Sequence, residues 1–173
     1  MHTRLLSCLL FSVFIRAAHS QAFDFEDYAE APVEWELVAK PAPSAEEQLV
    51  DFARRYLGTP YRYAGKTPAG FDCSGFAGFV FKEFGVALPA SSAEIARIGE
   101  AVERQDLSVG DLVFFEGRER TQTVGHVGIV SEVTGSDVYF IHAAVWSGGI
   151  IISGLKEEYY ASRYLKAKRV KIN

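Results

Sequence analysis

The stretch Asp72-Cys73-Ser74-Gly75-Phe76-Ala77-Gly78-Phe79-Val80-Phe81 predicts a helix that begins at a cysteine. Its apolar side chains recur at helical spacing, and Asp72 has the side chain of a helix cap. The sulfur of Cys73 would then lie at the positive end of the helix dipole, where the pKa of a thiol is lowered. The other cysteine of the chain, Cys8, lies in a predicted export signal. Cys73 is therefore expected to be either a buried apolar group or a reactive thiol.

The N-terminal segment predicts a signal for export. An apolar run covers residues 5–15, and small side chains follow at Ala18 and Ser20, so we expect cleavage near Gln21. The run is too short to anchor the chain across a membrane. A lipid anchor on Cys8 is a weaker alternative, because no apolar segment would remain ahead of the lipidated residue. We expect the mature protein in the periplasm or outside the cell.

Length and composition indicate one compact domain with short appendages. The chain has 173 residues, of which 49% are hydrophobic, and a formal net charge of -4. This mild acidity provides no basic patch for nucleic acid or for a membrane surface. We expect a signal peptide at residues 1–20, an acidic arm and linker at 21–43, and one domain at 44–173. Neither a cofactor nor a membrane span is expected, and the protein is expected to be a monomer.

Helices followed by strands predict an α+β fold. Ser44 and Glu47 form a capping box at the start of a helix that Gly58 would end, and Ser91 caps a third, short helix. After Gly110 the pattern changes to β-rich runs separated by short turns, which is typical of an antiparallel sheet. Helices and sheet should therefore be segregated. The predicted strands cover residues 111–116, 124–133, 137–143, 149–153 and 164–172.

Two histidines lie outside the predicted signal. His126 and His142 fall in the two strands of one predicted hairpin, which can bring them to the same end of neighbouring strands. Either one alone would more often be an ordinary core or surface residue. Together with Cys73 they form the set that acyl transfer needs, namely a nucleophile, a general base and a group that orients the base. A zinc site is the weaker alternative, because close pairs of ligands are missing.

Five motifs carry a resemblance to a known family. The resemblance is to the NlpC family of bacterial cell-wall cysteine endopeptidases, and it covers roughly Ala45 to the C-terminus. The resemblance implies a papain-like fold, with three N-terminal helices packed on a five- to six-stranded antiparallel sheet. It also implies Cys73 as nucleophile, His126 as base and His142 as the orienting residue. The motifs are Gly58-Thr59-Pro60-Tyr61-Arg62-Tyr63-Ala64-Gly65, Phe71-Asp72-Cys73-Ser74-Gly75-Phe76, Gly110-Asp111-Leu112-Val113-Phe114-Phe115, Gly125-His126-Val127-Gly128-Ile129 and Phe140-Ile141-His142-Ala143.

The resemblance implies further site residues around the thiol. The hydroxyl of Tyr61 would approach the sulfur and help to stabilise the oxyanion or to orient substrate. Asp72 and Ser74 would face the amine end of the substrate. From the residues alone, Tyr61 would be an aromatic of a loop packed on the core, and Asp72 a helix cap. The backbone N–H of Cys73 is the expected oxyanion donor, because it projects from the start of the helix.

The function that the resemblance implies is hydrolysis of an amide in the peptide stem of peptidoglycan. The bond would be the one between γ-linked D-glutamate and the diamino acid, cut through a thioacyl-enzyme. One alternative is an acyl hydrolase or transferase of the same fold that acts on another substrate, such as a toxin. Another is a catalytically idle module that binds the wall. The set of Cys73, His126 and His142 counts against the idle module, because binding alone requires none of them.

Overall fold

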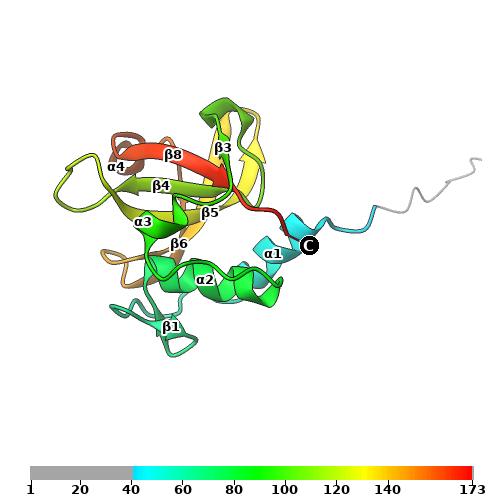
Figure 1. The fold of residues 1–173 in the computed structure, drawn as a ribbon, viewed down its shortest axis with the longest axis horizontal. Coiled ribbons are helices and arrows are strands. Elements are labelled where there is room, and N and C mark those ends of the chain that lie inside the picture. Colours follow the sequence, from blue (N-terminus) through cyan, green and yellow to red (C-terminus); the bar gives the residue numbers. More distant parts are fainter. Residues whose placement is uncertain (1–40, 173) are drawn as a thin grey trace, which may run out of the picture. The chain divides into compact units, whose positions relative to one another are not determined.

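The computed structural model describes residues 41–172 (Figure 1). The predicted signal peptide and nearly all of the predicted arm lie outside these residues. Along the chain the elements are α1 (Ala45–Arg54), β1 (Lys66–Thr67), β2 (Gly70–Phe71), α2 (Cys73–Glu83), α3 (Ser92–Ile95), β3 (Glu100–Val102), the 3-10 helix η2 (Arg104–Asp106), β4 (Leu112–Glu116), β5 (Val124–Thr134), β6 (Asp137–Ala144), β7 (Gly149–Gly154), α4 (Glu158–Ala161) and β8 (Tyr164–Arg169).

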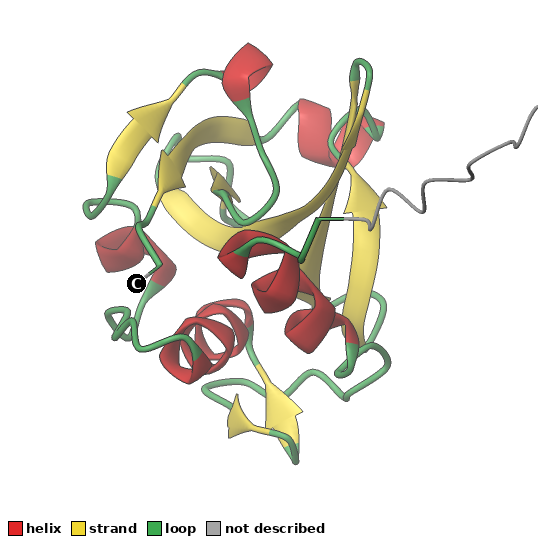
Figure 2. Ribbon diagram, turned by 90° about the vertical axis from the view of Figure 1, so that its right-hand side faces the viewer, coloured by secondary structure: helices red, strands yellow, loops and turns green. Residues whose placement is uncertain are grey.

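The described residues form an α+β fold with an antiparallel main sheet, which confirms the predicted class. The sheet has six strands in the order β3-β8-β4-β5-β6-β7, and every neighbouring pair is antiparallel. The five predicted strands are all present. The strand β3 was not predicted, because its three residues carry too little pattern. A second, two-stranded sheet of β1 and β2 was not predicted and projects from the rest (Figures 1 and 2).

Apolar side chains cover both faces of the main sheet. On one face, α1 and α2 contribute buried residues that pack with residues of the strands. On the other face, a second cluster packs beneath α4, so that α2 and α4 lie on opposite sides of β4 (Figure 1). The first cluster includes Leu49, Val50, Ala53, Phe76, Ala77, Val80, Ile129 and Ile141. The second includes Val113, Phe115, Val130, Phe140 and Leu155, with Tyr160 packed against it. Burial on both faces explains why Leu112–Phe115 is a continuous apolar run.

The capping box predicted for α1 is present. The hydroxyl of Ser44 accepts a hydrogen bond from the N–H of Glu47 at 3.1 Å, and the Glu47 carboxylate accepts one from the N–H of Ser44 at 2.8 Å. The α-helix ends at Arg54, and one tighter turn follows. Gly58 then reverses the chain with a φ of +79°. Gly58, which was predicted to end the helix, therefore follows this last turn and not the α-helix itself.

A close backbone approach fixes the start of α2. A Cβ atom on Gly75 would overlap the carbonyl oxygen of Gly65, so no larger residue fits at position 75 without a shift of the loop. The same carbonyl accepts a hydrogen bond from the N–H of Asp72 at 3.0 Å. The glycine after Cys73 and Ser74 is thus required by packing. It sets the position of Cys73 relative to the preceding loop.

The segment that follows α1, residues 58–61, also pairs with β7, the last strand in the order of the sheet. The N–H of Gly58 donates to the carbonyl of Ile150 at 2.9 Å, and the N–H of Ile150 donates to the carbonyl of Thr59 at 2.9 Å. The N–H of Tyr61 donates to the carbonyl of Gly148 at 2.7 Å. The segment after α1 is therefore held against the start of β7.

An ion pair explains the acidic residue of the Gly110-Asp111 motif. Asp111 is buried, and its two carboxylate oxygens accept hydrogen bonds from Arg169 Nε at 2.7 Å and Nη2 at 2.8 Å. One of them also accepts from the N–H of Ser108 at 2.8 Å. Forked contacts of this kind are among the stronger hydrogen bonds of proteins. They join the start of β4 to the end of β8.

Candidate active site

Cys73 is the first residue of α2 and is partly exposed, with no disulfide partner among the described residues. Its sulfur lies close to the backbone N–H groups of Cys73, Ser74 and Val127, which favour the thiolate. Val127 belongs to β5 and directly follows His126. The start of the helix is therefore placed beside the strand that carries the first histidine.

The two histidines of the predicted hairpin contact each other directly. Nε2 of His126 lies 2.9 Å from Nδ1 of His142, and the two rings meet edge to face, with centroids 4.9 Å apart. His142 is fully buried and His126 is partly buried. Gly128 follows His126 by two residues on β5, and a Cβ there would lie 2.5 Å from the Phe140 ring and 3.4 Å from the Cβ of His142. The glycine leaves room for the side chains of β6 next to the histidine pair.

Two hydroxyl groups contact the other ring nitrogen of His142. Its Nε2 lies 3.3 Å from the hydroxyl of Ser153 on β7 and 3.3 Å from that of Tyr160 in α4. If this nitrogen carries the proton and donates to them, Nδ1 is free to accept the N–H of His126. Nδ1 of His126 is then the nitrogen with a lone pair. The contacts are thus compatible with the tautomers that a general base at His126 requires.

Neither Ser153 nor Tyr160 was predicted to belong to the site. Ser153 ends an isoleucine-rich strand, and Tyr160 lies in a helix of four residues that was itself not predicted. No motif or spacing links either of them to His142. Only the pairing of β6 with β7 and the packing of α4 on the sheet bring the three side chains together.

Burial keeps both histidines neutral near pH 7. It lowers the pKa of His126 to about 4. Burial lowers the pKa of His142 as well, and the neighbouring His126 lowers it further. A neutral His126 can accept a proton, which a cationic one cannot. The burial of His126 therefore disfavours an imidazolium that would lower the pKa of the thiol.

The pKa of the Cys73 thiol is raised to about 11, not lowered as predicted. Burial of the sulfur is the main cause, and the nearby carboxylate of Asp72 adds to it. These effects outweigh the N–H groups of the helix start. The resting site therefore holds a neutral thiol and a neutral imidazole. The described hydrogen bonds include none between Cys73 and His126, and such contacts often tighten only when substrate binds.

The other predicted site residues surround the thiol. Burial raises the pKa of Tyr61, and so do Cys73 and Asp72, which places its hydroxyl near both. The carboxylate of Asp72 accepts hydrogen bonds from the N–H of Gly75 at 2.6 Å and from the buried hydroxyl of Ser74 at 3.0 Å. Asp72 is thus the cap of α2. Asp72 and Ser74 are the chain neighbours of Cys73, and Tyr61 pairs with Phe71, two residues before Cys73.

The described residues were also considered as a possible metal site and as a possible membrane span. Among residues 41–172, no group of three or more His, Cys, Asp or Glu side chains is placed so that it could hold a metal ion. No helix of the same residues is long and apolar enough to cross a bilayer.

Comparison with known proteins identifies the family. The model of the NlpC/P60 family matches residues 58–169, which include both histidines and Cys73. The chain belongs to the NlpC/P60 family. A similar protein is the Escherichia coli (strain K12) "Murein DD-endopeptidase MepS/Murein LD-carboxypeptidase", which is 40% identical over 124 residues. This match covers 71% of the chain and 62% of the relative.

A second NlpC/P60 relative differs in its named substrate. The Bacillus cereus "Gamma-D-glutamyl-L-lysine dipeptidyl-peptidase" is 33% identical over 129 residues, which cover 75% of this chain and 37% of that protein. The matched residues therefore cover less than two thirds of the length of each of these two relatives. A solved NlpC/P60 structure from Bacillus cereus superposes with a TM-score of 0.65 and 32% identity, over 75% of this chain and 41% of that one. The similarity thus extends to the fold.

Proposed function

We propose that this protein is an exported cysteine peptidase that hydrolyses an amide in the stem peptide of peptidoglycan. The observation that carries the proposal is the contact of His126 with His142 beside the N-terminus of α2, where Cys73 lies. The names of its NlpC/P60 relatives support the class of substrate. As the resemblance implied, the proposed bond joins γ-linked D-glutamate to the diamino acid.

In the first step, Nδ1 of His126 takes the proton of the Cys73 thiol while the sulfur attacks the carbonyl carbon. A neutral thiol and a neutral imidazole suit this step, because the proton is then transferred as the sulfur attacks. The carbonyl oxygen becomes an oxyanion, for which the backbone N–H of Cys73 is the proposed donor and Tyr61 a second one. His142 holds the charged imidazole of His126 in place through their 2.9 Å contact.

The intermediate then collapses and the amide C–N bond breaks. The proton on Nδ1 of His126 passes to the departing amine, and the acyl group remains on Cys73 as a thioester. Water attacks the thioester carbonyl after giving a proton to His126. The C–S bond breaks, the acid leaves, and the sulfur regains its proton from His126. Asp72 and Ser74 are proposed to face the free amine of the stem peptide on the acyl side.

The direct test is to incubate the protein from Gln21 onward with purified muropeptides and to measure product masses. We expect one new amine terminus on the diamino acid and none with Cys73→Ala. A wild-type protein that forms no new amine terminus contradicts the wall-hydrolase function. A Cys73→Ala protein that cuts equally well contradicts the mechanism alone.

A further inference from the structure

A cavity of about 240 Å³ lies beside the two histidines. His126 and His142 bound it on the sheet, together with the segment that follows β4, the loop between β6 and β7, and α4. Cys73, on the helix side of the site, does not line it. We call this cavity the arginine pocket, because the guanidinium-bearing residues Arg118 and Arg163 line it.

Arg163 is held in position but keeps an unused donor. Its guanidinium carbon lies 3.9 Å from the centre of the Tyr159 ring, and its Nη1 donates to the Tyr159 carbonyl at 3.2 Å. Its Nε is buried and has no hydrogen-bond partner among the described residues. A buried donor without a partner costs free energy, and an acceptor on a ligand would recover it.

The positive charge of the pocket is not balanced by the protein within residues 41–172. Glu116 is the carboxylate that lines the pocket, and its oxygens accept the N–H of Gln122 at 2.8 Å and face Nε of Arg120 at 3.6 Å. No described carboxylate forms an ion pair with Arg118 or Arg163. The pocket therefore suits an anionic group of a ligand.

The remaining walls indicate the kind of anion. Guanidinium groups bind carboxylates well, because their forked N–H groups match the two oxygens. The ring of Trp146 is 77% exposed, lines the pocket, and lies 5.9 Å from the guanidinium carbon of Arg118. This ring offers an apolar surface to methylene groups. A carboxylate at the end of a short aliphatic chain fits both features.

The position of the pocket indicates which part of the substrate it receives. His126 borders the pocket, and in acyl transfer the base returns its proton to the departing amine. Cys73, which keeps the acyl part, does not border it. The arginine pocket is therefore on the side of the amine product.

We propose that the arginine pocket binds the free carboxylate at the far end of the diamino acid whose amine is released. The protein would then prefer a diamino dicarboxylic acid, such as diaminopimelic acid, to lysine at this position. This inference rests on the proposed function, since it takes the stem peptide as substrate. It adds Arg118 and Arg163 as residues that determine specificity.

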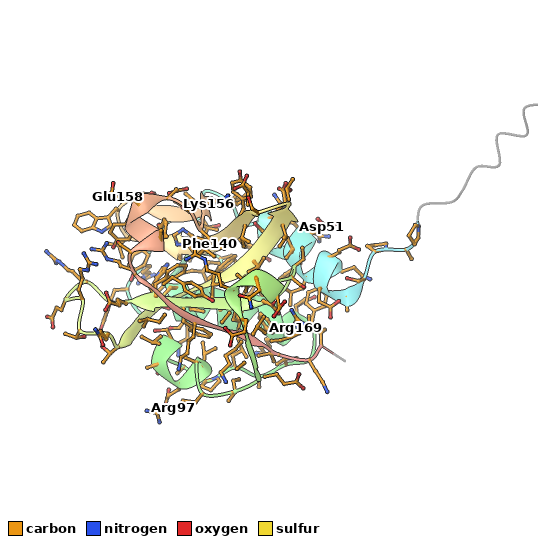
Figure 3. All side chains as sticks on the ribbon, turned by 90° about the horizontal axis from the view of Figure 1, so that it is seen from above. Asp51, Arg97, Phe140, Lys156, Glu158 and Arg169 are labelled. Carbon is orange, nitrogen blue, oxygen red and sulfur yellow. The ribbon has the colours of Figure 1, made fainter. Side chains whose placement is uncertain are left out.

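The test compares ligands in which the far carboxylate is present, replaced by a neutral carboxamide of the same shape, or absent. Cys73→Ala protein is titrated calorimetrically with L-Ala-γ-D-Glu-X, where X is diaminopimelic acid, the same residue with its far carboxylate amidated, or lysine. We expect the acid to bind roughly tenfold or more tightly than the carboxamide, as a charge-assisted contact predicts. Adding Arg118→Gln or Arg163→Gln should remove most of this preference. Arg97→Gln is the control, because Arg97 is exposed and lies far from Glu158 of α4 (Figure 3).

Equal affinity for the acid and the carboxamide would overturn the proposal. A preference that persists in both arginine variants would overturn it as well. Arg118 is exposed, so Arg118→Gln is informative even if Arg163→Gln does not fold. Hydrolysis of the same three peptides by the wild-type protein separates this proposal from the proposed function. If the wild-type protein cuts none of the three peptides but the Cys73→Ala protein still prefers the acid in titration, the proposed function is contradicted and the arginine pocket is supported.

Discussion

Nε2 of His126 lies 2.9 Å from Nδ1 of the fully buried His142, so one imidazole is held by another rather than by a carboxylate. In this pair the second ring can accept the N–H of the first without adding a negative charge near the thiol. The arrangement makes the orientation of His126 depend on the tautomer of His142.

Replacement of His142 should impair the chemical step more than binding. His142→Leu removes the acceptor for His126, and we expect kcat to fall roughly 10²- to 10⁴-fold with little change in KM. His142→Asn offers an amide oxygen at a similar place and should retain more activity than His142→Leu. Steady-state kinetics on a stem tripeptide measure both variants, and circular dichroism checks their folding. Equal kcat values for wild type and His142→Leu would contradict an orienting role.

The two hydroxyls at Nε2 of His142 should substitute for each other. Ser153→Ala and Tyr160→Phe each leave one acceptor at 3.3 Å, so each alone should lower kcat only a few-fold. The double variant leaves the N–H of a buried imidazole without a partner, which costs about 1–3 kcal/mol. We expect a loss in kcat clearly larger than the product of the two single losses. Simple multiplication of the single effects would show that the hydroxyls act independently.

The acid limb of the pH profile should lie well below the ordinary pKa of histidine. Burial lowers the pKa of His126 to about 4, and only its neutral form can act as base. The value of kcat/KM should therefore persist as pH falls from 7 to 5 and be half lost near pH 4. A half-loss near 6.5, the value of an unperturbed histidine, would contradict the described burial.

The same burial should make folding sensitive to mild acid. The pKa values of His126 and His142 are lower in the folded than in the unfolded protein, so the unfolded chain takes up protons first as pH falls. The free energy of unfolding should therefore decrease as pH drops below about 6.5 and continue to decrease towards pH 4. Urea denaturation at pH 7 and pH 5 measures this loss. His142→Asn removes one of the two groups and should show a smaller difference between the two pH values.

Alkylation should report a thiol that is protonated at neutral pH. Burial raises the pKa of Cys73 to about 11, so the rate of iodoacetamide labelling should still rise between pH 8.5 and pH 10. The chain from Gln21 onward contains no other cysteine, which makes mass spectrometry of the intact protein unambiguous. Cys73→Ala protein is the blank. A rate that reaches its plateau below pH 8 would restore the activated thiolate that the helix dipole had suggested.

Two glycines of α2 should respond to alanine with opposite signs. A Cβ on Gly75 would overlap the Gly65 carbonyl, so Gly75→Ala should destabilise the fold by roughly 3 kcal/mol, the upper range for overpacking. A Cβ on Gly78 meets no atom within 4 Å. Gly78→Ala should stabilise by about 0.5–1 kcal/mol, because alanine is the better helix former. Thermal denaturation of both proteins measures the difference, and equal effects would exclude the close approach.

Patterns of several residues explain what could be predicted from the sequence. The strands β4 to β8 each carry five or more residues between turn signals, and the capping box at Ser44 and the side-chain cap at Ser91 use local chemistry. His126 and His142 could be paired because one hairpin joins their strands. Cys73 was conspicuous because it is the one cysteine beyond the predicted signal.

The remaining features depend on distant parts of the chain. Tyr160 reaches His142 only through the packing of α4, whose four residues are too few for a helical pattern. The pKa of Cys73 depends on how deeply the sulfur is buried, and the backbone N–H groups of the helix start, which could be predicted, lower the pKa by less than burial raises it. Arg118 and Arg163 stand 45 positions apart and line one pocket only after the sheet has formed.

The pairing of residues 58–61 with the start of β7 has a consequence for solubility. The strand β7 is last in the sheet order, and an unpaired strand edge is a template for aggregation with other chains. Here hydrogen bonds from Gly58 and to Thr59 occupy part of that edge at Ile150. The segment that carries Tyr61 thus also shields part of this edge in the folded protein. Variants in this segment that lose activity should therefore be checked first for self-association.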